Sequence, residues 1–166
     1  MTWTAPATWT AAQVVGATDL NTQLRDNLIY LVGGGSPPAA IVREGVADYS
    51  TSSTSFVDVD VTNLIRTITP QGGKIWGWFA CRLTADNTAS SEAQVDVILD
   101  STTRFGGTNG AAYQPQNSAN WICFPFYFST TAGVAHTIKP QYRNKVAATT
   151  TISNNAHPVV LVVMGA

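Results

Sequence analysis

The chain has 166 residues and a formal net charge of −1, and 11% of its residues are charged, against roughly 25% in typical soluble domains. Its lysines and arginines are scattered, so no basic patch indicates nucleic acid, and no apolar run is long enough to span a bilayer. The start lacks the basic segment and apolar run of a signal peptide, so we expect assembly in a cytoplasm. A surface of hydroxyl and amide groups suits a protein that packs against neighbours, because buried charge is costly.

Residues 1–17 show no helical or strand periodicity, and we interpret them as an extended anchoring arm. Trp3 and Trp9 are its large apolar side chains, and they have no local core to enter. Two interpretations stay open. The indoles fold back onto the chain's own helix or β domain, or they anchor the arm in a partner's pocket, since tryptophan is strongly enriched at binding hot spots.

Residues 18–32 predict one amphipathic helix, with Thr18 as N-cap and Asp19 favouring the helix dipole. Its apolar stripe consists of Leu20, Leu24, Leu28 and Leu31. A helix of about four turns is too short to be stable alone in water, so it must dock. We favour self-association through this stripe; the alternative is packing against the chain's own β domain. Residues 33–40, rich in glycine and proline, predict a linker.

Residues 41–166 alternate with period two and predict a β domain. Eight or nine short strands separated by Gly, Asn, Ser and Thr turns are typical of an antiparallel β-sandwich, jelly-roll-like in type. The fold class is therefore mainly β, preceded by the arm and one short helix. The expected strands are 41–49, 53–61, 64–69, 74–84, 93–100, 120–128, 135–143, 148–152 and 159–163.

Two of these strands are apolar on both faces. Trp76 and Trp78 oppose the core side of the first, and Phe124 and Phe126 lie on the second. A monomeric sandwich should have a polar outer face. We therefore expect these four residues to form the interface of a homotrimer; the alternative is simple burial of central strands.

The residues that usually carry chemistry form no recognisable motif. His136 falls at an inward position, and His157 precedes a proline at a strand start. Asp58 and Asp60 share one face of a strand, but two carboxylates are weak evidence for a cation site. We therefore assign no catalytic residue, metal or cofactor and expect the protein not to be an enzyme.

The remaining candidates are also interpreted structurally. The glycine-rich segment 105–110 precedes no helix and lacks a lysine, so it predicts a surface loop rather than a phosphate cradle. Tyr113 beside it could stack on a sugar, although one tyrosine does not make a lectin. Cys81 and Cys123 lie on separate predicted strands. We interpret them as small buried apolar residues, with a disulfide as the alternative.

Two segments resemble virion proteins of tailed bacteriophages. The first runs through Thr8-Trp9-Thr10 to Leu24-Arg25-Asp26-Asn27 and is similar to the "TW…G..VTA..LN..LRDN" opening of small phage structural proteins, although Gly16 here follows the valines. The second runs from Ser129 to Arg143 and resembles an "AG.HT.K.QW/YR" strand of phage fibre and spike domains. Pro140 departs from that pattern and hints at an edge strand or a bulge.

The resemblance implies a homotrimeric virion component with an N-terminal anchor and an outward jelly roll. With no shaft repeats, we expect a capsid decoration or short head-fibre protein that binds the major capsid protein or another virion protein. A tail-fibre or tail-tip receptor-binding protein with a host-surface glycan as ligand is the alternative. A polysaccharide hydrolase is a third class, against which the missing acid pair speaks.

Overall fold

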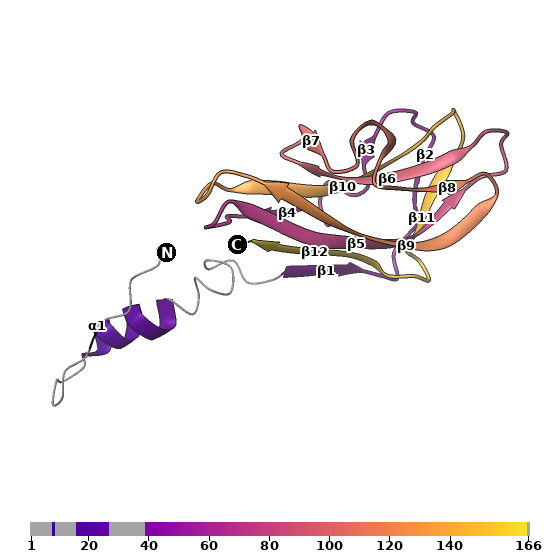
Figure 1. Cartoon of the computed structure of the whole chain (residues 1–166). Helices are drawn as coiled ribbons and strands as arrows, with labels where there is room; N and C mark the ends of the chain where they lie inside the picture. Colours follow the sequence, from indigo (N-terminus) through magenta and orange to yellow (C-terminus); the bar gives the residue numbers. More distant parts are fainter. Residues whose placement is uncertain (1–7, 9–15, 27–38, 166) are drawn as a thin grey trace.

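The protein is a two-layer antiparallel β-sandwich preceded by a short helix, which confirms the predicted fold class (Figure 1). The computed structural model describes residues 8, 16–26 and 39–165. Trp3, Trp9, Leu28 and Leu31, which carry the predictions for the arm and for half of the helical stripe, lie outside the described residues.

Sheet A has six strands and is organised around the long strand β5 (Lys74–Ala85). One edge of β5 pairs with β12 (Val159–Gly165) and with β11 (Thr150–Ser153). Outside these lie β1 (Ala39–Arg43), paired with β12, and β2 (Tyr49–Thr51), paired with β11. The other edge of β5 pairs along its whole length with β9 (Ser118–Ser129).

Sheet B also has six strands and is centred on β10 (His136–Asn144) and β6 (Glu92–Leu99). The short strands β3 (Val57–Asp58) and β4 (Arg66–Ile68) pair with β10. The strands β7 (Thr103–Arg104) and β8 (Ala112–Pro115) pair with β6, and a 3₁₀ turn at Gly107–Asn109 lies between them. The sequence did not predict β7 or β8.

Several predicted strand boundaries shift, and two of these shifts adjoin β1. Ala39 and Ala40 belong to β1, so the predicted linker over residues 33–40 extends too far. The expected strand over residues 41–49 is instead the end of β1 and the start of β2, and between them Gly45 has a φ of +72°. This left-handed conformation costs a glycine nothing and breaks the extended run.

The core lies between the sheets and is built from alternate residues of each strand. On β5 the inward residues are fully or nearly buried, and they include Ile75, Phe79 and Leu83. Facing them from sheet B are Val95 and Val97 of β6 and Ile138 of β10. The period of two that predicted the strands therefore also selects the core side of β5.

Pro140 lies in a central strand, not in an edge strand. On one side of β10, β6 pairs with residues 138–144; on the other, β4 pairs with residues 136–138 and β3 with residues 141–142. Pro140 falls in the gap between β4 and β3, where a missing N–H donor breaks no ladder pair. Its carbonyl accepts a hydrogen bond from the N–H of Val59 at 3.0 Å.

The helical segment begins one residue earlier than predicted, with α1 (Ala17–Leu20) continuing as a π-helix over Asn21–Asp26. Gly16, and not Thr18, is the N-cap, because it is the extended residue that precedes the first helical residue, Ala17. The carboxylate of Asp19 accepts the N–H of Gly16 at 3.3 Å. Figure 1 shows this segment apart from the two sheets. Neither helical segment in the described ranges is long and apolar enough to cross a membrane.

Candidate functional site

The outer face of sheet A carries apolar side chains across four neighbouring strands. Antiparallel register places directly opposed residues on the same side of a sheet, so the face follows from the pairings of β1, β12, β5 and β9. We call it the apolar face. Its members are Ala40, Val42, Val160, Val162, Met164, Trp76, Trp78, Ala80, Trp121, Cys123, Pro125 and Tyr127.

The large side chains of this face are exposed in the single chain. Their exposed fractions run from 40% for Trp78 to 59% for Val42, with Trp76, Trp121 and Tyr127 between these values. At roughly half of the 150–250 Å² that a buried aromatic covers, the four aromatics alone expose on the order of 400 Å². The largest apolar patch on a typical monomer has about this size and is often functional.

Polar residues border the apolar face at its ends. Lys74 is the first residue of β5, and Arg82 lies on the same face toward the other end of the strand. The guanidinium of Arg82 is 3.2 Å from Nε2 of His157, and the ring of His157 meets the edge of Trp121 at a centroid distance of 5.5 Å. An apolar centre with a polar rim is the usual anatomy of a protein–protein interface.

The edge of sheet A formed by β9 is protected by a proline. Within the described residues, β9 pairs with β5 and with no other strand. Pro125 lies in the middle of β9, opposite Trp78, and has no backbone donor to offer a further strand. Addition of a strand from another chain at the β9 edge is therefore disfavoured.

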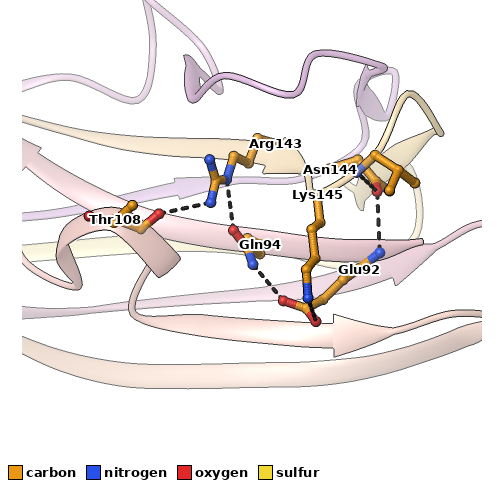
Figure 2. A network of polar contacts seen from close by, with 7 residues as sticks. Glu92, Gln94, Thr108, Arg143, Asn144 and Lys145 are labelled. Carbon is orange, nitrogen blue, oxygen red and sulfur yellow. Dashed lines mark hydrogen bonds and ion pairs between the residues drawn. The ribbon is translucent and has the colours of Figure 1, made fainter. Parts of the chain in front are cut away.

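The outer face of sheet B is polar and internally hydrogen-bonded. Figure 2 shows Nε of Arg143 donating to Gln94 at 2.7 Å, Gln94 donating in turn to Glu92, and Lys145 lying 3.4 Å from Glu92. Asn144, on the same strand but fully buried, accepts the N–H of Glu92 at 3.2 Å. The polar groups in these contacts are hydrogen-bonded to one another, so this face is stable when it is exposed to water.

A second polar chain crosses sheet B beside the first. Asp58 accepts hydrogen bonds from Lys139 at 2.6 Å and from Gln141 at 2.7 Å, and Arg104 donates to Gln141 at 3.1 Å. Asp60 belongs to a different cluster around Tyr49, so the two carboxylates that share a predicted strand do not converge. The two outer faces thus differ sharply in chemistry.

Trp76 and Trp78 lie on the apolar face, where the sequence placed them. Phe124 and Phe126 do not: both are buried between the sheets, and predicting them as interface residues was wrong. Phe124 lies opposite the core residue Phe79, with the ring centroids 6.0 Å apart. The residues of β9 that face outward, Trp121, Pro125 and Tyr127, were missed as interface candidates.

The described part of the predicted helical stripe is unpartnered. Leu20 and Leu24 are 46% and 57% exposed. A leucine that is half exposed contributes little to a fold, so these side chains are available to another surface. Self-association of the helix stays a prediction.

The cysteines are both free thiols, which answers the question that the sequence left open. Cys81 is buried in the core, and burial raises the pKa of its thiol far above the ordinary range. Cys123 is exposed on the apolar face, so predicting it as buried was wrong. The two residues lie one position out of register on neighbouring strands and point to opposite faces of sheet A.

Among the described residues, no three His, Cys, Asp or Glu side chains gather where they could hold a metal ion. His136 lies 2.6 Å from Asp100, whose second oxygen accepts the N–H of Thr137. Although burial acts in the opposite sense, these contacts lower the pKa of Asp100. The pair thus anchors the start of β10.

Comparison with known proteins gives no family. No protein-family profile and no curated protein matches the chain. Among solved structures, the chain is similar to dimeric latent PorU from Porphyromonas gingivalis, with 8% sequence identity and a TM-score of 0.38 over 77% of this chain. The match spans 13% of the length of that protein.

Proposed function

We propose that this chain is a non-enzymatic bacteriophage virion protein, of the capsid decoration or short head-fibre type, that trimerises and attaches to the particle through its N-terminal arm and helix. The observation that supports assembly is the apolar face, on which Trp76, Trp78 and Tyr127 are exposed together. The phage assignment rests on the resemblance of the opening segment and of the strand ending at Arg143.

A closed oligomer accounts for this face better than an open one. A cyclic assembly covers the same patch on every copy and leaves no apolar surface at an end. Strand addition at β9 would produce an open assembly, and Pro125 opposes it. The polar outer face of sheet B would then point away from the axis and into solvent.

The helical segment supplies a second contact. Leu20 and Leu24 are exposed on it, and the opening segment carries Trp3 and Trp9. An arm and an amphipathic helix can be buried against a particle while the sandwich stands outside. The cost of ordering the arm is about 1–2 kcal/mol per residue, so the partner must offer backbone hydrogen bonds as well as pockets for the two indoles.

Sedimentation equilibrium tests the assembly. Wild-type protein at micromolar concentration should have three times the mass of the chain, and Trp78→Lys should be monomeric, because a lysine at the centre of the interface would bury an unpaired charge. Tyr113→Lys is the matched control: it places the same charge at an exposed aromatic on sheet B and should leave the trimer intact. A wild-type monomer or dimer would contradict the proposal.

Attachment is tested on particles. Deleting residues 1–36, or replacing Trp3 and Trp9 with alanine, should abolish co-sedimentation with phage particles that lack the protein. Antibody labelling in the electron microscope should place the wild-type chain on the head in hundreds of copies. Labelling of a few copies at the tail would instead support the second candidate.

The second candidate is a tail receptor-binding protein. The observation that favours it is a groove on the outer face of sheet B, where two hollows flank Arg143. Such a groove faces solvent in the proposed trimer and could meet a host surface.

A further inference from the structure

The groove on sheet B consists of two hollows that share one wall. The first, of about 380 Å³, is lined by Phe56, Arg104 and Arg143 and by hydroxyl-bearing residues around them. The second, of about 490 Å³, is lined by Tyr113, Gln94, Glu92 and Lys145 among others. Arg143 borders both, so the two hollows are neighbours on the outer side of sheet B, and we call the pair the groove.

Two guanidinium groups stack on one aromatic ring in the first hollow. The guanidinium carbons of Arg104 and Arg143 lie 4.8 and 4.6 Å from the centroid of the Phe56 ring. Cation–π contact of this kind offsets part of the repulsion between two like charges held close together. Phe56 in turn packs against Gly110, where an added Cβ would lie 3.1 Å from the ring.

Hydrogen bonds hold both arginine side chains in place but leave some of their N–H donors unpaired. Arg143 donates through Nε to Gln94, through Nη2 to the carbonyl of Thr108 at 2.8 Å and through Nη1 to that of Thr54 at 3.3 Å. Arg104 donates only through Nε, to Gln141. Its two terminal nitrogens have no partner among the described residues and offer the planar fork that binds an oxyanion in bidentate fashion.

The charge of the first hollow is positive. Its described lining holds two arginines and no carboxylate. Asp96 lies nearby but is fully buried, with one oxygen bound to the N–H groups of Val97 and Gly106, so its charge offsets Arg104 only in part. Asp58 is paired with Lys139. The hollow therefore favours an oxyanion.

The second hollow suits a sugar ring. Tyr113 is 61% exposed and presents an aromatic ring beside the amides of Gln94 and Asn109 and the charges of Glu92 and Lys145. The face of an aromatic ring is negative and attracts the weakly positive C–H groups of a pyranose. Both amide atoms of Gln94 are already paired, so the exposed amide of Asn109 and the exposed ammonium of Lys145 are the groups that can meet sugar hydroxyls.

We propose that this groove binds an acidic saccharide, whose carboxylate or sulfate group meets Arg104 and Arg143 while a neighbouring ring lies on Tyr113. Nucleic acid is a poorer occupant, because the two arginines do not continue into a basic stripe and the chain carries a net charge of −1. The inference does not depend on the proposed trimer; it gives the second candidate function a ligand.

Titration calorimetry on the full chain tests the proposal with defined probes. Tetragalacturonate carries a carboxylate on each ring, a heparin-derived tetrasaccharide carries sulfate groups as well, and maltotetraose carries neither. We expect one or both acidic probes to bind and maltotetraose not to bind. The acidic probe that binds more tightly shows whether the site prefers a carboxylate or a sulfate group. Equal binding of maltotetraose, or no binding of any probe at millimolar concentration, would overturn the proposal.

Variants locate the site. Arg104→Gln should weaken binding of the acidic probe about tenfold, the usual loss for a charge-assisted hydrogen bond. Arg104→Lys keeps the charge but loses the planar pair of donors, so its affinity for the acidic probe should lie between those of the wild type and Arg104→Gln. Tyr113→Ser should weaken the tetrasaccharide about tenfold while inorganic sulfate binds as before.

Lys74→Gln is the matched control, since it removes one positive charge at the end of β5, outside the groove, and should change affinity less than about twofold. If Lys74→Gln weakens binding as much as Arg104→Gln, the acidic probe is attracted by positive charge in general, and the groove is not a specific binding site. If inorganic sulfate binds as tightly as the tetrasaccharide, the sugar-binding half of the proposal is wrong. Sedimentation of the same samples reports the oligomer separately, so failure of one proposal is distinguishable from failure of the other.

Discussion

Trp76 of β5 lies directly opposite Tyr127 of β9, and both side chains are exposed on the side of sheet A that faces away from the core. Inward neighbours of the same two strands, Ile75 and Phe128, are buried. These strands therefore bury apolar side chains on one face and expose them on the other, which an isolated sandwich has no reason to do.

The two cysteines should differ in reactivity, and the difference should report assembly. Cys81 should resist alkylation because it is buried and its thiol pKa is raised by that burial. Cys123 should react readily in a monomeric Trp78→Lys variant and at least about tenfold more slowly in the wild type, where a neighbouring copy covers the apolar face. Mass spectrometry after timed treatment with iodoacetamide measures both rates. Equal rates at Cys123 would mean that this part of the face stays open.

Neighbouring residues on β9 should have opposite effects on folding. Phe126 is 2% exposed, and Phe126→Ala should lower the free energy of unfolding by about 3–5 kcal/mol, because it leaves a cavity between the sheets. Tyr127→Ala, one residue along and facing outward, should change it by less than about 1 kcal/mol in the monomer but weaken association. Urea unfolding in the Trp78→Lys background separates the two effects. A small loss for Phe126→Ala would show that its ring is not part of the core.

The sequence predicts where the strands are better than it predicts which face of each strand is buried. On β5, Lys74 and Arg82 share one alternating face with the two tryptophans, which identifies that face as outward. On β9, both alternating sets are apolar, and only the register with β5 decides which is buried. Phe126 lies opposite Gly77, where an added Cβ would come within 2.7 Å of the phenyl ring, so the missing side chain makes the space that the ring fills. This pairing joins residues that are far apart in the sequence, so no local sequence pattern predicts it.

The groove could not be predicted for a similar reason. Phe56 precedes β3, Arg104 ends β7 and Arg143 lies near the end of β10, so the stack joins three segments far apart in the chain. Phe56 lies beside a strand of two residues and Arg104 lies in another, and strands of that length are too short to show a period. The glycine-rich segment 105–110 was predicted as a surface loop, and its placement beside Arg143 depends on the pairing of β6 with β7 and β8.

The sandwich should fold without the N-terminal segment. Every buried member of the core lies between Val59 and Val163, and β1 begins at Ala39. Deleting residues 1–36 should therefore leave the midpoint of thermal unfolding within about 2 °C of the full-length value. Circular dichroism at 215 nm is the measurement, with Leu24→Asp in the full chain as a milder variant that should also leave it unchanged. A large fall for either would assign the helix to the core of the sandwich and contradict the division of the chain.

Acid should destabilise the protein through Asp60. Burial raises the pKa of this carboxyl, but hydrogen bonds from Asn63, from the N–H of Thr62 and from Tyr49 outweigh it and lower the pKa to about 2 from a usual 3.8. Between these values the unfolded chain takes up a proton that the folded chain does not, so stability rises with pH through this window and is lost as pH falls toward 2.

Replacing Asp60 should remove that contribution. After allowance for solvent screening, Asp60→Asn should lower stability at pH 7 by on the order of 1 kcal/mol and flatten the dependence between pH 4 and 2. Glu44→Gln, which neutralises an exposed carboxyl, should leave the slope as it is. Urea unfolding at half-unit pH steps measures the slopes. If the Asp60 variant and the wild type lose stability in parallel below pH 4, the hydrogen bonds around Asp60 do not hold its charged form in solution.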